Sequence, residues 1–454
     1  MKMLKIKQII LLLLIGSGVM ITSCNKEYIN PSTASVESVT TSLDGLMNLC
    51  AGLQRRFTIG RQSPLYTAPI GGAYSVYALY TLNVGNQAEK ELETGKGSVT
   101  KGNAIVIQMW AQCLLTRTEA ETILNNLSLA ANPSDKVGLK AYASIFYAMS
   151  MGTLVQFFEK IPLTNGANAA FSPRADALQK AIIVLESADA DLTTTAPSTK
   201  FLGKVPAGID IKNTVKALLA RYYNIQSMIT GTYNATSGNK ALAFAGVASQ
   251  TIKSEFRFTA TTTNPLGELN FTKNVFGAID STLGLKNGLA PVPAASDPRI
   301  GFYISKQDAV TYPLRAFFAN TTSSYPVYLP GEMNLIIAEN YARQSSFTQS
   351  KTALDVVLTK TSDIFDLPSQ APPPNKLAAA QSPYSGPLTM TALLQEIYKQ
   401  RRIEMFLSGQ ELEDSRRFNR PAPNSANEER NRTFYPYPFI ERDNNTNTPD
   451  DPAI

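Results

Sequence analysis

The sequence predicts a mostly α-helical protein, in which paired helices form a scaffold in the manner of tetratricopeptide arrays and carry a loop-rich face with minor β structure. Two observations predict this class. Apolar residues recur at helical spacing in several segments, and these segments follow one another in pairs with short connections. Between them lie stretches rich in Gly, Pro, Thr, Asn or aromatic residues, around 59–103, 232–330 and 367–388, which we expect to be loop-rich.

The clearest helical segment is FSPRADALQKAIIVLESADADL, residues 171–192. Ser172 is a good N-cap there, Pro173 suits the first helical position, and leucine and isoleucine recur behind them at helical spacing. A second helix is predicted within 213–231, with Gly231 as its stop. The same criteria predict helices within 102–129, 136–158, 331–344, 350–364 and 390–409.

The first residues have the layout of a secretory signal. Lysines precede a short apolar run, and small residues follow it. The run is too short and too interrupted to cross a bilayer. The lipobox ITS precedes Cys24, although an ordinary cysteine after an ordinary cleavage site is the alternative. We therefore predict a signal peptide over 1–23 and a single domain over 24–454, held at a membrane by lipid on Cys24.

The composition narrows the possible chemistry. The 454 residues include no histidine and three cysteines, which excludes histidine-dependent nucleophiles, histidine-based zinc sites and thiolate metal sites. A carboxylate pair, as in glycoside hydrolysis, or calcium binding through oxygen ligands remains. The 42 basic residues, several of them in the predicted signal peptide, are interspersed with 36 acidic ones. We therefore expect no nucleic-acid partner.

Two smaller questions concern a disulfide and calcium. Cys50 and Cys113 could form a disulfide in an exported protein, but each lies in an apolar helical context and we favour two buried free thiols. The segment ERDNNTNTPDDP, residues 441–452, could hold calcium, yet we favour a solvated tail. We therefore predict no metal site and no cofactor.

The most distinctive segment of the sequence is LLQEIYKQRRIEMFLSGQELEDSRRFNRP, residues 393–421, where acidic residues lie among arginines. Read alone, it could be a catalytic carboxylate cluster. Because each acid has an arginine nearby that keeps it ionised and occupied, we favour a structural ion-pair network that pins the last helices. The residues assigned to this network are Arg401, Arg402, Glu404, Asp414, Arg416 and Arg417.

This segment resembles the C-terminal signature of the SusD/RagB family, the surface glycan- and nutrient-binding lipoproteins of Bacteroidota. KQRRIEM, residues 399–405, matches the family's helix end with Gln in place of the leading acid, and Gly409 matches its Gly turn. Asp414, Arg416 and Phe418 match the last part, with Phe in place of Trp. Further similar segments occur in the family's order at 109–127, 157–164, 215–226, 329–343 and 435–449. The departures indicate a divergent branch.

The resemblance implies about eight helices in tetratricopeptide-like pairs, with loops across that scaffold as the ligand face. It implies a protein without catalytic activity that captures oligosaccharides, or in some members peptides, and delivers them to a SusC-like TonB-dependent transporter barrel. It also implies a lipid-anchored location at the outer membrane, facing the cell surface.

Loop tyrosines beside asparagines are the candidate ligand residues, because sugars stack on aromatic rings and bond to amide, acid and arginine side chains. Trp110 lies inside an apolar helix and is expected in the core. The first candidate set is Tyr74, Tyr77, Tyr80, Asn83 and Asn86, and the second is Tyr303, Tyr312 and Tyr325. The alternative is that these rings cover the helices behind them. A face without tryptophan also argues against a starch-like helix as the ligand.

Two other functions remain open from the residues alone. A glycoside hydrolase needs an acid with a raised pKa in an apolar pocket, and no acid has such a context in the sequence. A tetratricopeptide-like scaffold that binds proteins needs an apolar or charged groove on its concave face. That second function leaves the loops rich in Tyr and Asn unexplained.

Overall fold

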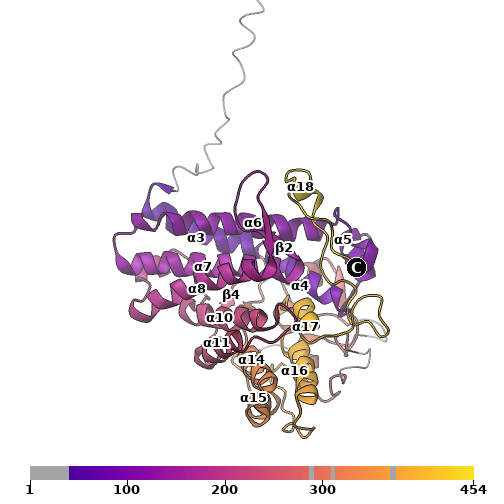
Figure 1. The fold of residues 1–454 in the computed structure, drawn as a ribbon. Helices are drawn as coiled ribbons and strands as arrows, with labels where there is room; N and C mark the ends of the chain where they lie inside the picture. Colours follow the sequence, from indigo (N-terminus) through magenta and orange to yellow (C-terminus); the bar gives the residue numbers. More distant parts are fainter. Residues whose placement is uncertain (1–39, 286–290, 308–311, 369–374) are drawn as a thin grey trace, which may run out of the picture.

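The main helices lie beside one another in chain order. The computed structural model describes residues 40–285, 291–307, 312–368 and 375–454, so the predicted signal peptide and Cys24 lie outside the described residues. The stack consists of α3 Leu43–Thr58, α6 Ala104–Asn125, α7 Pro133–Phe157, α8 Arg174–Thr194, α10 Ile211–Met228, α11 Ala235–Val247, α14 Pro330–Arg343 and α15 Phe347–Thr359. Figure 1 shows these helices layered across the molecule. The predicted class, a mostly helical scaffold of stacked helix pairs, is confirmed.

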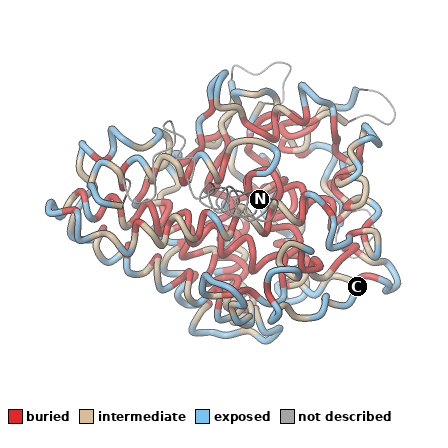
Figure 2. The backbone as a smooth tube through the Cα atoms, turned by 90° about the horizontal axis from the view of Figure 1, so that it is seen from above, coloured by how far each residue is buried: buried red, intermediate tan, exposed pale blue. Residues whose placement is uncertain are grey.

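A second group of helices covers one side of the stack (Figure 1). It contains α4 Pro64–Ser75, α5 Gln87–Thr94, α16 Met390–Glu404 and α17 Glu411–Arg417. The short helices α9 Thr199–Leu202, α12 Pro265–Gly267, α13 Pro298–Tyr303 and α18 Phe439–Arg442 lie in the connections. Figure 2 shows buried residues running through the middle of the molecule, with exposed residues along its rim.

Helix α7 is the centre of the core. Every residue from 141 to 157 is buried, because α3, α6, α8 and α10 all pack against it, and a helix that is apolar on all sides needs such surroundings. Glycine permits a close approach here. A Cβ added at Gly152 would lie 2.4 Å from the ring of Tyr222 on α10.

Capping side chains set several helix starts. Asn103 accepts hydrogen bonds from the N–H groups of Ile105 and Val106, and so begins α6. The predicted N-cap at Ser172 is wrong. Ser172 lies in β3 Phe171–Pro173, which pairs with β2 Lys160–Pro162, and α8 begins at Arg174. The sheet pairing holds this stretch extended, so the helix cannot start there.

Two of the predicted loop-rich segments also contain helices. Helices α4 and α5 lie within 59–103, and α11 lies within 232–330. All residues of α4, PLYTAPIGGAYS, are buried, so its sequence has no polar face and therefore no amphipathic period that would predict a helix. The described residues of 367–388 contain no helix or strand.

The strands of the described residues form three antiparallel pairs. Besides β2 and β3, β1 Leu79–Thr81 pairs with β5 Phe276–Ala278, and β4 Glu255–Phe256 pairs with β6 Tyr325–Pro326. The β1–β5 and β4–β6 pairs hold together loops that are distant in sequence. The three pairs are the minor β structure that the sequence predicts.

Cys50, Cys113 and Trp110 lie in the core. Cys50 and Cys113 are buried free thiols, the alternative that the sequence favours. Trp110 is 1% exposed, and its indole N–H donates to Glu441 at 3.0 Å, so its expected place in the core is confirmed.

Within the described ranges, no helix combines the length and apolarity that crossing a membrane requires. No acid or cysteine cluster suited to a metal occurs in this part of the chain either.

Candidate ligand-binding site

Buried pairs of arginine and carboxylate join α16 and α17 to the scaffold. Asp414 on α17 lies 2.7 Å from Nε of Arg401 and 2.7 Å from Nη2 of Arg417. Nη1 of Arg417 lies 2.5 Å from Oε1 of Glu339 on α14. Burial raises the pKa of Glu339, but Arg417 and the neighbouring arginines outweigh it and bring the pKa to about 2. Glu339 is therefore ionised and held in place.

Two further residues of the predicted network have partners of their own. Glu404 pairs with Arg299 at 3.0 Å and also with Lys360. Arg416 pairs with Glu413. The acids among arginines thus form several separate clusters. Structural ion pairs hold the carboxylates of Glu404, Glu413 and Asp414.

Arg402 donates hydrogen bonds to backbone turns, whereas the sequence predicts that it belongs to an ion-pair network. Its guanidinium donates to the carbonyl oxygens of Leu283 and Val76 and to the hydroxyl of Tyr398. Leu283 and Tyr77 have φ angles of 54° and 59°, in the left-handed region that strains residues other than glycine. The assignment of Arg402 to the ion-pair network is therefore corrected, because its partners are neutral oxygens at two strained turns.

Glu411 has the raised pKa that a hydrolytic acid needs, and its sequence context does not indicate it. Burial raises the pKa of Glu411 to about 7, and its Oε2 has no hydrogen-bond partner among the described residues. The carboxyl group faces Gly72 on α4, where an added Cβ would lie 2.6 Å from Oε2. This contact leaves no space for a substrate. Neighbouring Asp414 is already occupied by two arginines, so the pair of free acids that glycoside hydrolysis uses is missing here.

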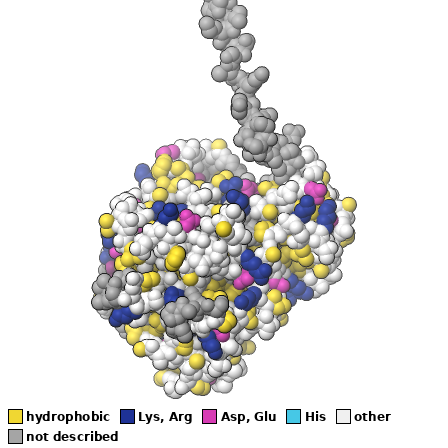
Figure 3. Space-filling model, turned by 180° about the vertical axis from the view of Figure 1, so that it is seen from behind, with side chains coloured by type: hydrophobic (Ala, Val, Ile, Leu, Met, Phe, Trp, Pro, Cys, Tyr) yellow, Lys and Arg dark blue, Asp and Glu magenta, His cyan; other side chains and the backbone are white. Residues whose placement is uncertain are grey.

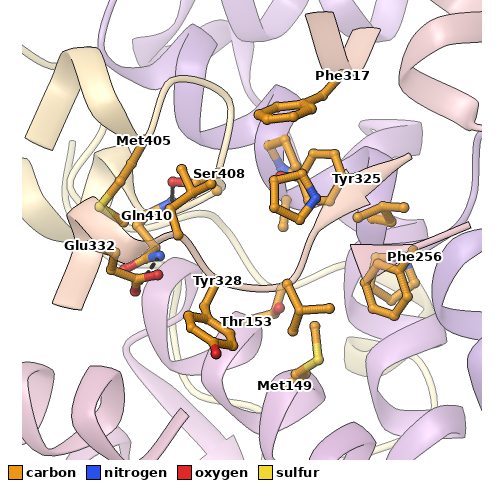
Figure 4. A pocket seen from close by; sticks show the side chains of 18 of the residues that line it. Met149, Thr153, Phe256, Phe317, Tyr325, Tyr328, Glu332, Met405, Ser408 and Gln410 are labelled. Carbon is orange, nitrogen blue, oxygen red and sulfur yellow. Dashed lines mark hydrogen bonds between the residues drawn. The ribbon is translucent and has the colours of Figure 1, made fainter. Parts of the chain in front are cut away.

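An aromatic cavity lies where α4, α7, α10 and the turn between α16 and α17 meet. Figure 4 shows Phe317 and Tyr325 on one side and Glu332 and Gln410 on the other. Gln410 donates to Glu332 at 3.1 Å, and Glu332 pairs with Arg221 at 2.6 Å. Nearly all of the lining residues are buried and these polar groups are already paired. The cavity is therefore an internal junction, beyond the reach of an oligosaccharide.

Three of the predicted ligand tyrosines belong to the interior. Tyr74, Tyr303 and Tyr325 are 0%, 1% and 7% exposed. Their hydroxyl groups bond to the Thr81 hydroxyl at 2.9 Å, the Glu404 carbonyl at 2.7 Å and the Leu407 carbonyl at 2.7 Å, respectively. The prediction that they offer ring faces to a ligand is wrong, because core packing covers the rings and satisfies their polar ends.

Tyr80 and Tyr312, one from each predicted set, lie on opposite sides of β5 and are half-buried, as is Tyr77. Strand β1 places Tyr80 opposite Gly277 of β5. The next residue, Ala278, donates its N–H to the carbonyl of Tyr312 at 3.1 Å. A Cβ at Gly277 would lie 3.2 Å from the ring of Tyr80, so glycine allows this ring to lie across β5. Strand β1 and the segment at Tyr312, which are far apart in sequence, thus both contact β5.

Asn86 lines a surface hollow whose other residues the sequence does not single out. The hollow lies between the turn after α3 and the starts of α5 and α6, and its volume is about 370 Å³. Its polar lining is Arg61, Gln62, Asn86, Gln87 and Gln108, and its apolar lining is Ala88, Ala104 and Ile105. Exposed Asn83 lies next to it, since its carbonyl accepts from the Asn86 amide at 3.1 Å. Three elements contribute the lining, so no local pattern marks it.

The chemistry of the hollow suits a hydroxyl-bearing ligand. Amide side chains donate and accept hydrogen bonds at once, and the small apolar side chains between them offer a surface for the C–H face of a ring. Its size is typical of small-molecule sites, about 300–1,000 Å³. On the face seen in Figure 3, basic and acidic side chains are interspersed, with no large area of one sign.

No family model and no curated protein matches the chain. Solved structures do match it. A SusD homolog from Bacteroides thetaiotaomicron is 13% identical, with a TM-score of 0.67 over 92% of this chain and 99% of that one. A putative sugar binding protein from Bacteroides vulgatus is 14% identical, with a TM-score of 0.65 over 90% and 98%. A SusD-like carbohydrate binding protein from the same species is 14% identical, with a TM-score of 0.61 over 83% of each chain. The chain therefore has the SusD-like fold.

Proposed function

We propose that this protein is a lipid-anchored binding protein of the outer membrane, facing the cell surface. It captures oligosaccharides, or peptides in a variant of the same role, and delivers them to a SusC-like TonB-dependent transporter barrel without catalysing a reaction. The observation that carries this proposal is the fold, shared over about nine-tenths of the chain with a structure described as a putative sugar binding protein and with a SusD homolog. Fold alone does not imply function, so the proposal also needs support from the residues.

The residues support binding over catalysis. The lipobox before Cys24 supplies an anchor. The carboxylates of the last helices are occupied by arginine, and Glu411 faces backbone. The ligand face we propose consists of the hollow at Asn86 with neighbouring Asn83, together with Tyr80 and Tyr312 on the two sides of β5. Tyr77 joins this face, and its hydroxyl donates to Glu428 at 2.7 Å.

Purification of the native, lipidated protein from its outer membrane in a gentle detergent tests the transport role. We expect a stoichiometric large β-barrel protein to co-purify. A Cys24→Ser variant is the control, because it should lose both the lipid and the membrane fraction. Recovery of the lipidated protein alone, under conditions that keep other barrel complexes intact, would contradict delivery to a transporter.

Calorimetric titration of the purified protein with an oligosaccharide panel and a peptide panel tests the capture role. Binding of a glycan without turnover supports the main proposal, and binding of peptides alone supports the peptide variant. Release of shorter sugars that disappears in a Glu411→Gln variant would instead establish a hydrolase. The geometry at Gly72 leads us to expect no such turnover.

A further inference from the structure

We propose that the hollow at Arg61 and Asn86 selects neutral sugar units and rejects acidic ones such as uronates. This inference rests on the proposed capture function and assigns a ligand class to one part of the ligand face. An exposed arginine at a surface hollow would ordinarily attract anions. The surroundings of Arg61 reverse this expectation.

The charge of Arg61 is neutralised by a buried acid. Its Nη2 lies 2.5 Å from Oε2 of Glu89, and its Nε lies 3.1 Å from Oε1 of the same residue. Glu89 is 0% exposed, and the hydroxyl of buried Tyr66 donates to it at 2.6 Å. This two-point contact fixes the guanidinium plane as well as its charge. Arg61 is therefore a rigid donor with little attraction left for an anion.

A second acid makes the local field still less suitable for an anion. Glu91, two residues after Glu89 on α5, accepts hydrogen bonds from Asn103 at 2.8 Å and from Gln87 at 3.2 Å. Lys90 between these acids pairs with Glu93 at 2.8 Å. These two basic and three acidic side chains carry a net charge of −1, which disfavours a carboxylate or a sulfate.

Hydrogen-bonding groups remain available for hydroxyls. Nη1 of Arg61 has no partner among the described residues. Nη2 of Arg61 donates to the Asn86 amide oxygen at 3.1 Å, which fixes that side chain. Asn86 is the N-cap of α5 but makes no capping hydrogen bond. Neutral hydroxyl groups can accept from these donors and donate to the amide oxygen of Gln62.

Titration of the full mature protein tests this inference with paired probes. The neutral probes are gluco-, manno-, galacto- and xylo-oligosaccharides, and the acidic probe is oligogalacturonate of matched length. We expect the best neutral probe to bind at least about tenfold more tightly than the acidic one, which corresponds to about 1.4 kcal/mol. Tighter binding of the acidic probe would overturn the inference.

Single-residue variants then test whether Arg61 and Asn86 of the hollow bind the neutral sugar. Arg61→Lys keeps the charge but loses the planar two-point contact, and Asn86→Ala removes the fixed amide. We expect each variant to lower the affinity for the neutral probe about fivefold or more. The matched control is Arg55→Lys, at an exposed arginine on α3 that does not line the hollow. This variant should bind as the native protein does. Thermal unfolding confirms that each variant is folded.

The outcomes separate this inference from the function on which it rests. Neutral binding that is unchanged in Arg61→Lys and Asn86→Ala would overturn the role of the hollow and leave capture intact. Failure of every glycan to bind, neutral or acidic, would overturn both the inference and glycan capture. Co-purification of a transporter barrel would in that case still support delivery of another cargo, such as a peptide.

Discussion

Nη1 of Arg417 on α17 lies 2.5 Å from Oε1 of Glu339 on α14, and both side chains are shielded from solvent. The two residues belong to helices that are distant in sequence, so this pair ties the C-terminal helices to the stacked scaffold. Losing Glu339 removes one of the two carboxylates that pair with buried Arg417, the other being Asp414. Removing one charge from a buried ion cluster is costly in a low-dielectric interior.

We therefore expect Glu339→Gln to lower the free energy of unfolding by about 3 kcal/mol or more. The control is Glu186→Gln, which breaks the pair with Lys240. The side chains of Glu186 and Lys240 are 34% and 48% exposed, respectively. An exposed pair of this kind contributes about 0–1 kcal/mol. Denaturant titration measures both variants. Equal losses in the two would contradict the structural role of the buried pair.

The pH dependence of stability should carry the signature of Glu411. Its pKa rises from 4.5 to about 7 on folding, so between these values the folded state holds a proton that the unfolded state releases. Stability from this group is present at low pH and decreases as the pH rises toward 7, by on the order of 3 kcal/mol. Glu411→Gln should remove this decrease and stabilise the protein at pH 8 while changing little at pH 4.5.

Glu413→Gln is the control for this experiment, because Arg174 and Arg416 outweigh burial and hold the pKa of Glu413 at about 2. The contribution of Glu413 is present above pH 4.5 and is lost only as the pH falls toward 2. Its variant should therefore be less stable at both pH 4.5 and pH 8. A Glu411→Gln variant that behaves in the same way would show that its carboxyl is ionised in the folded protein.

Two glycine-to-alanine substitutions in helices should have opposite effects. At Gly152 the new Cβ would lie 2.4 Å from the ring of Tyr222, so we expect a loss of about 1–3 kcal/mol from overpacking. At Gly52, inside α3, nothing lies within 4 Å of the new Cβ, so we expect a gain of about 0.5–1 kcal/mol from the reduced entropy of the unfolded chain. Thermal unfolding compares them, and a gain at Gly152 would disprove the close packing of α7 and α10.

Tyr80→Ala should weaken an oligosaccharide that the native protein binds by about 1 kcal/mol, because a stacking surface is lost. Tyr80→Phe keeps the ring and should bind nearly as the native protein does. Titration calorimetry measures both. Unchanged affinity in Tyr80→Ala would remove the β1–β5 edge from the ligand face.

Helices with one apolar face were predictable from sequence, and helices without a polar face were not. The segment that holds α8 is amphipathic, so its helical period is visible in the sequence. The helix nevertheless begins at Arg174 and is not capped by Ser172, because Ser172 pairs in a strand. Helix α4 is buried on all sides, so its sequence resembles a loop rich in glycine and aromatic residues. Only its packing partners reveal it as a helix.

The candidate site shows the same division. Asn86 was predictable as a polar loop residue beside aromatic ones, but Arg61 and Gln108 come from other elements and carry no local signal. Tyr74 and Tyr80 have similar sequence surroundings, yet the first is buried and the second lies at a sheet edge. Burial depends on neighbours that are distant in sequence, so sequence spacing cannot separate the two.

By itself the sequence determined the helical class, the absence of histidine chemistry and the placement of acids among arginines in the last helices, because composition and periodicity are local properties. The tertiary structure alone decided which tyrosines face solvent, that Arg402 binds carbonyl oxygens at strained turns, and that Glu89 neutralises the arginine of the hollow. Each of these depends on side chains from separate elements meeting at hydrogen-bond distance, which only the folded chain brings about.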